Sequence, residues 1–211
     1  MPIRKAILLL VSAACFGALP ALAQSIEEVA QQGLDAYRAG DYEAAVVAWQ
    51  QMIELDPNSA DAYNNLGATL YQLGELEASA EAYQQSLEID SENAGTYNNL
   101  GTVLALQEDY EGAVAAYERA IELDPNLPEV YANLGNLLPA EQAILAYQRA
   151  AELNPEYVEA YNNLGVLLAS EGRYEEAIAA YNQALEIDPD FQPAQENLAA
   201  AEAAIAAEAE E

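Results

Sequence analysis

The chain has 211 residues and a formal net charge of −30, from 36 acidic residues against six basic ones and no histidine. Such a charge repels polyanions, so we expect no nucleic acid and no anionic membrane surface as partner, and we expect a neutral or basic one. With no histidine, one lysine and one cysteine, the usual general bases, thiol nucleophiles and transition-metal ligands are missing, so we expect neither an enzyme nor a cofactor nor a metal.

Residues 1–23 have the pattern of an export signal. Two basic residues at 4–5 precede an apolar run over 6–14, and the helix breaker Pro20 stands before a small-x-small cleavage site that ends at Ala23. We expect cleavage near Ala23; the alternative is an uncleaved membrane anchor.

The predicted mature chain is cysteine-free, because Cys15 lies inside the export signal. Lipid anchoring at Cys15 is not expected, since Ser12 stands three residues earlier, where a lipidation motif usually has leucine. All 36 acidic residues and only four arginines remain, a net charge of −32. The expected location is the periplasm, the extracellular medium or an organellar lumen.

From residue 26 to residue 191 one repeating unit is written five times. A glycine recurs at spacings of 34, 34, 34 and 30, and an aromatic residue recurs at spacings of 34, 34, 30 and 34. The glycines are Gly33, Gly67, Gly101, Gly135 and Gly165, and the aromatics are Trp49, Tyr83, Tyr117, Tyr147 and Tyr181. A fixed period of this length predicts stacked helical hairpins, each of which buries its apolar face against its neighbours.

Each unit is expected to hold two amphipathic helices. In the second unit Tyr63, Leu66 and Leu70 follow the spacing of one helical face, and Gly74 ends that helix. An Asp-Pro or Asn-Pro pair closes four of the five units, because proline cannot continue a helix. The predicted units are 26–59, 60–93, 94–127, 128–157 and 158–191, followed by a capping helix and acidic tail over 192–211.

The order of residues within the units resembles the tetratricopeptide repeat family. In the third unit its pattern of aromatic, Leu-Gly, Ala, aromatic and Pro is met by Tyr97, Leu100, Gly101, Ala113, Tyr117 and Pro125. The resemblance covers residues 26–191. It implies an all-α, right-handed superhelical solenoid of five helix-turn-helix hairpins with a C-terminal capping helix.

The fourth unit is four residues short. The spacing from its glycine, Gly135, to its aromatic residue, Tyr147, is 12, whereas the same spacing in the other units is 16. Four residues are close to one helical turn, so the apolar face rotates by only about 40° and stays in phase. We place the loss in the turn region, with Pro139 where the second helix should begin. A shortened hairpin that still packs is expected.

The inner surface of such an array is lined mainly by the first helix of each hairpin, at positions 2, 6, 9 and 13 of the unit; we call this surface the groove face. Asparagine stands at the sixth position of four consecutive units, and a primary amide both donates and accepts hydrogen bonds. We call these residues the Asn ladder: Asn65, Asn99, Asn133 and Asn163.

The Asn-Asn-Leu-Gly sequences around three ladder residues resemble the repeats of O-linked N-acetylglucosamine transferase, without its catalytic domain. That resemblance implies that the Asn ladder holds the main chain of an extended peptide. The alternative is that these amides only stabilise neighbouring helices.

Other groove-face residues would select among peptides. Acidic residues at the second position would favour positive side chains, and polar residues at the ninth would add contacts; they are Asp61, Glu129 and Glu159, and Thr102 and Asn136. No arginine occupies a ladder-type position, so we do not expect the basic clamp with which some tetratricopeptide domains hold acidic peptide ends.

The predicted function is a non-enzymatic scaffold or adaptor that binds a neutral-to-basic protein segment. The rival is a structural, self-associating envelope component using its convex face or terminal helices. Tyr71 and Tyr157 are candidate aromatics for that role, although we expect both to be buried between hairpins. A third reading is a weak cation buffer with clusters such as 188–190, but no twelve-residue calcium loop is present.

Overall fold

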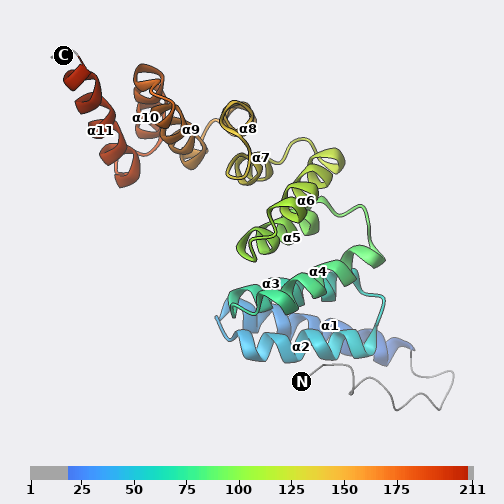
Figure 1. The fold of residues 1–211 in the computed structure, drawn as a ribbon. Coiled ribbons are helices and arrows are strands. Elements are labelled where there is room, and N and C mark those ends of the chain that lie inside the picture. Colours follow the sequence, from blue (N-terminus) through green and yellow to red (C-terminus); the bar gives the residue numbers. More distant parts are fainter. Residues whose placement is uncertain (1–18, 209–211) are drawn as a thin grey trace.

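The computed structural model describes residues 19–208, and every element of regular secondary structure in this range is an α-helix (Figure 1). Most of the predicted export signal, including Cys15, and the last three residues of the acidic tail lie outside the described residues. The helices are α1 (Leu19–Arg38), α2 (Tyr42–Leu55), α3 (Ala60–Gln72), α4 (Leu76–Ile89), α5 (Ala94–Leu106), α6 (Tyr110–Leu123), α7 (Pro128–Gly135), α8 (Ala140–Leu153), α9 (Val158–Ser170), α10 (Tyr174–Ile187) and α11 (Gln192–Glu208).

Successive helices pair into five hairpins, α1 with α2 through α9 with α10, and α11 follows as the cap. Figure 1 shows the hairpins stacked in chain order into a curved array whose two ends lie far apart. The predicted all-α solenoid is therefore confirmed.

Side-chain caps fix where several of the helices begin. Asp41, Ser59, Asn93 and Asp109 each accept a hydrogen bond from the backbone N–H three residues later. Such a cap satisfies one of the N–H groups that the first helical turn leaves without a partner.

Within every hairpin the repeated glycine lies against the repeated aromatic ring. A Cβ atom built on Gly67 would stand 2.8 Å from the ring of Tyr83, and one built on Gly165 would stand 2.5 Å from Tyr181. No real side chain approaches so closely, so the absence of a Cβ lets the two helices pack. All five aromatics are buried, as their period predicts.

The fourth hairpin is shortened within its first helix. Helix α7 has eight residues where α3, α5 and α9 have 13, while α8 keeps the usual 14. Our placement of the loss in the turn region is therefore wrong. The reason is Pro139, which disfavours helix in the residue before it; α7 ends at Gly135, residues 136–139 form the turn, and Pro139 is the N-cap of α8.

This shortened hairpin still packs, as expected. A Cβ atom built on Gly135 would lie 3.1 Å from the ring of Tyr147, so the helices touch there less tightly than in the other hairpins.

In four of the five hairpins the turn between the two helices holds one residue in the left-handed conformation. Gly40, Gly74 and Gly172 supply it with φ of 77°, 76° and 72°. The third hairpin has Glu108 at this point, with φ of 64°.

The core is largest at the C-terminal end. One cluster of buried residues runs without a break from Ala132 in α7 to Ala201 in α11, and three smaller clusters lie before it. Tyr71 and Tyr157 pack against these clusters and are partly buried, in agreement with the expected burial between hairpins.

Helix α1 begins at Leu19, ahead of the predicted cleavage site. Pro20 stands in its first turn, where a missing N–H breaks no helical hydrogen bond. Within residues 19–208 no helix combines the length and the apolar character needed to span a bilayer.

Candidate functional site

The Asn ladder comes from the first helices of four successive hairpins, α3, α5, α7 and α9, and each of its residues is partly exposed. The acidic residues of the second position, Asp61, Glu129 and Glu159, lie in the first turns of α3, α7 and α9 and are exposed. The groove face therefore presents amides beside a row of carboxylates.

A neighbouring column of polar side chains holds successive hairpins together. The Asn98 Oδ1 atom accepts a hydrogen bond of 3.1 Å from Asn133, and the Asn162 Oδ1 atom accepts one of 3.0 Å from Asn197. Asn64 accepts in the same way from the Thr96 hydroxyl at 3.1 Å. These asparagines stand at the fifth position, so the side chains of this position form hydrogen bonds to the next unit or to the capping helix.

The side chains of the Asn ladder make fewer hydrogen bonds within the described chain than the asparagines of the fifth position. Asn133 uses one amide N–H on Asn98, and Asn163 accepts from Asn162 at 3.3 Å. The side chains of Asn65 and Asn99 make no hydrogen bond to any described part of the chain. Donors and acceptors of the ladder thus remain free toward the groove face.

Two packing tyrosines reach through to the ninth position of the groove face. The Tyr117 hydroxyl donates to Thr102 at 3.2 Å, and the Tyr147 hydroxyl donates to Asn136 Oδ1 at 2.6 Å. Burial raises the pKa of both tyrosines. The Asn136 oxygen thus accepts one hydrogen bond from Tyr147, and the Asn136 amide N–H groups make none within the described chain.

A hollow of about 290 Å³, open to solvent, lies between α7, α8 and α9; we call it the repeat-four hollow. It brings together two of the predicted residues, Asn136 and Asn163. Its other lining residues are Gly135, Leu138, Ala143, Tyr147, Val166, Leu167 and Ser170. Asp61, Asn65, Asn99 and Thr102 lie in earlier hairpins, outside this hollow.

Two carboxylates act on Tyr157, the residue that precedes α9. The pKa of Tyr157 is raised by burial first, and then by the negative charges of Glu159 and Glu129. Both carboxylates are exposed, one in the first turn of α7 and one in that of α9.

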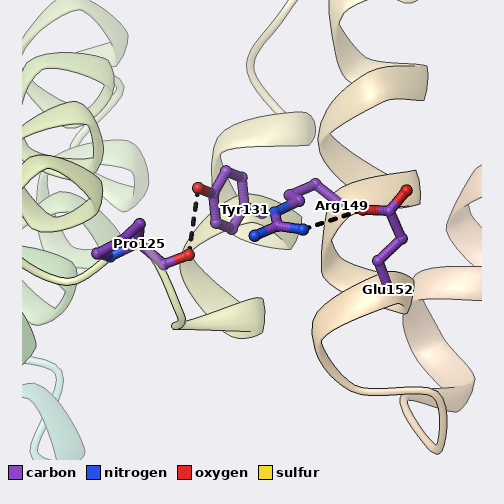
Figure 2. Close-up of polar contacts among 4 residues, drawn as sticks. All are labelled: Pro125, Tyr131, Arg149 and Glu152. Carbon is purple, nitrogen blue, oxygen red and sulfur yellow. Dashed lines mark hydrogen bonds and ion pairs between the residues drawn. The ribbon is translucent and has the colours of Figure 1, made fainter.

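Each described arginine is paired with an acidic residue three positions away. The four exposed pairs are Arg38–Asp35, Arg119–Glu122, Arg149–Glu152 and Arg173–Glu176. Figure 2 shows Arg149 between Tyr131 and Glu152, with the Tyr131 hydroxyl donating to the Pro125 carbonyl at 3.4 Å. Exposed pairs of this kind add little stability. Arg38 stands at position 13 of the first unit, on the groove face, and the other three arginines belong to the second helices or the turn before one.

Val166 and Ser170, at the predicted groove-face positions 9 and 13 of the fifth unit, both line the repeat-four hollow; Val166 is 45% exposed and Ser170 is exposed. Sequence reasoning gave them no part in the site. It did not name Asn197, which continues the ladder register into α11, one full repeat after Asn163. Counting the sixth position on into the capping helix would have found it.

Stacked helical hairpins whose first helices present a continuous polar face define an α-solenoid repeat protein. Family profiles described as TPR repeat match residues 33–74, 69–108, 103–138 and 140–172, and one described as tetratricopeptide repeat matches residues 158–191. The chain belongs to the tetratricopeptide repeat family, and its fold is that of an interaction scaffold.

Solved structures share this architecture. PilF of Pseudomonas aeruginosa is 25% identical with a TM-score of 0.72, and the match covers 86% of this chain and 90% of PilF. MamA is 25% identical with a TM-score of 0.69, covering 74% and 94%. YrrB, described as a TPR protein with an unusual peptide-binding site, is 24% identical with a TM-score of 0.67, covering 83% and 96%; that likeness shows the fold alone. A search of curated proteins finds no match.

Within residues 19–208 no group of three or more acidic, histidine or cysteine side chains is arranged to hold a metal ion.

Proposed function

We propose that this protein is a non-enzymatic adaptor that binds an extended, neutral-to-basic segment of another protein across its groove face. The observation that carries the proposal is the Asn ladder: four amides in register on four successive first helices, all partly exposed. Within the described chain, Asn65 and Asn99 keep every side-chain donor and acceptor free. Such amides can pair with the main chain of a peptide whatever its side chains.

The preference for neutral or basic segments is electrostatic. Asp61, Glu129 and Glu159 are exposed beside the ladder, and the described arginines are paired with other acidic residues. Attraction of this kind acts mainly on the association rate and is screened by salt. Binding of a lysine-containing peptide is therefore expected to weaken as ionic strength rises.

The test compares two sets of substitutions on the same helices. The ladder variant changes Asn65, Asn99, Asn133 and Asn163 to alanine. The control changes Asn64, Asn98 and Asn162 to alanine, which removes the fifth-position hydrogen bonds between hairpins. Binding to an array of synthetic extended peptides is measured for both, with helicity and melting temperature followed by circular dichroism.

Loss of peptide binding in the ladder variant, with helicity kept, is the expected result. The control should bind peptide like the parent but melt earlier. If the ladder variant binds as well as the parent and only melts earlier, the amides are scaffolding and the proposal fails.

We also propose that the protein works in an exported compartment, after cleavage near Ala23 and without a lipid on Cys15. Helix α1 would then keep residues 24–38. Amino-terminal sequencing of the chain recovered from the exported fraction tests this; a chain that still begins at Met1 would contradict it.

A second candidate is self-association through the second helices. Val47 in α2 and Leu145 in α8 are 64% and 65% exposed. Each stands two residues after a buried alanine of its helix, Ala45 or Ala143. Sedimentation at two concentrations decides the matter, since a monomer at both would exclude it.

A further inference from the structure

The repeat-four hollow lies at the end of the shortened helix α7. In α3, α5 and α9 the first helix continues five residues past the length of α7. Here α7 ends at Gly135, and Gly135 and Asn136 line the hollow. Val166 and Ser170 of α9, at positions 9 and 13, also line it and are exposed.

The lining combines an apolar wall with a polar rim. Val166, Leu138 and the ring of Tyr147 supply apolar surface, and Val166 stays 45% exposed. Asn163 and Asn136 add amides, and Asn136 keeps both amide N–H groups free while its oxygen accepts one hydrogen bond from Tyr147. At about 290 Å³ the hollow lies at the lower end of ligand pockets, which suits one side chain rather than a whole small molecule.

The electrostatic surroundings select the segment that bears this side chain. Glu129 and Glu159 are exposed in the first turns of α7 and α9, and neither forms an ion pair with a described arginine. Glu159 precedes Val166 by seven residues, about 10 Å along α9. An extended chain covers that distance in about three residues.

We propose that the repeat-four hollow is an anchor pocket for one apolar side chain, such as leucine, of a bound segment that also carries a basic residue about three positions away. The Asn163 amide would hold the main chain beside the anchor. This inference rests on the proposed function and adds to it the sequence preference of the partner.

The test uses four fluorescent ten-residue peptides in a Gly/Ser/Asn background. They carry lysine or serine at one position and leucine or alanine three residues further on, and their dissociation constants are measured by anisotropy. The parent chain is expected to bind the Lys/Leu peptide about tenfold more tightly than the Lys/Ala peptide, because leucine buries more apolar surface.

Two matched variants locate the pocket. Val166→Glu places a carboxylate at the hollow, and Tyr110→Glu makes the same change at the start of α6, at a residue that is 54% exposed and lies outside both the hollow and the groove face. The leucine preference should vanish in Val166→Glu while the lysine preference stays, and Tyr110→Glu should keep both. If Val166→Glu does not fold, Ser170→Phe, which fills the hollow from an exposed position, should remove the leucine preference in the same way.

The outcomes separate the two proposals. Lysine-dependent binding without a leucine preference, or a leucine preference that survives both Val166→Glu and Ser170→Phe, overturns the anchor pocket and leaves the proposed function standing. No binding of any of the four peptides by the parent overturns the anchor pocket, and the separate ladder experiment then decides the proposed function.

Discussion

Glu108 lies in the left-handed conformation, which glycine adopts at the same point of three other hairpins. A side chain in the left-handed region costs about 1–2 kcal/mol, and glycine recovers part of this at the expense of a more flexible unfolded chain. We expect Glu108→Gly to raise the free energy of unfolding by about 0.5–1 kcal/mol. Urea denaturation followed by circular dichroism measures it. As a control, Glu118→Gly in the middle of α6 should lower the free energy by about 1 kcal/mol; a loss at both sites would contradict the strain at Glu108.

The repeated glycines differ in how closely the aromatic ring approaches. Gly165→Ala places a methyl group 2.5 Å from the Tyr181 ring, and overpacking of this kind costs about 1–3 kcal/mol. At Gly135 the nearest ring atom of Tyr147 is 3.1 Å away, so Gly135→Ala should cost about 1 kcal/mol or less. Thermal and urea unfolding of the two variants provide the comparison. Equal losses would mean that the ring positions do not decide the cost.

At the scale of the element, the missing turn of α7 can be restored. Residues 136–139 are replaced by a copy of residues 166–173, which form the end of α9 and its turn to α10. This replacement brings the fourth unit to the full length of the others. The added turn should bury leucine side chains and raise the free energy of unfolding by about 1–3 kcal/mol. It should also close the repeat-four hollow.

Melting temperature and the binding of the Lys/Leu and Lys/Ala peptides measure both effects together. A restored helix that leaves the leucine preference intact would show that the hollow does not depend on the shortening of α7. The parent chain and Tyr110→Glu serve as controls.

The period of the sequence was enough to predict the hairpins and the glycine–aromatic contacts, because each depends on spacing alone. It was not enough to place the deletion. Leu137 and Leu138 continue the apolar pattern of a helix, so where α7 stops depends on how the chain reaches Pro139.

Side-chain direction also escaped sequence reasoning. Adjacent asparagines such as Asn98 and Asn99 look alike in the sequence, yet they point about 100° apart on a helix. Only the structure separates Asn98, which bonds Asn133 of the next hairpin, from Asn99, which stays free within the described chain.

For the whole molecule, buried tyrosines set the alkaline limit of stability. Burial raises the pKa of Tyr83, Tyr117, Tyr147, Tyr157 and Tyr181 above the ordinary value of 10. A raised pKa in the folded state gives stability that is complete below pH 10 and is lost as the pH rises further, because the unfolded chain releases these protons first.

We expect helicity to be constant from pH 8 to about pH 10 and to fall above it, together with ionisation of the buried tyrosines. Circular dichroism and the ultraviolet absorbance of tyrosinate follow the two events. Tyr83→Phe should make the loss less steep, while Tyr110→Phe, at a residue that is 54% exposed, should change little. Ionisation of every tyrosine near pH 10 with the helices intact would contradict this account.

The unbroken core from α7 to α11 has a consequence for the order in which the protein can become stable during synthesis. The ribosome makes the smaller clusters first, and the largest one is complete only when Ala201 has been added. In a stacked array each hairpin is stabilised by its neighbours. A growing chain therefore lacks its best-supported block until Ala201 has been made, and the early hairpins spend that time with the weakest tertiary support.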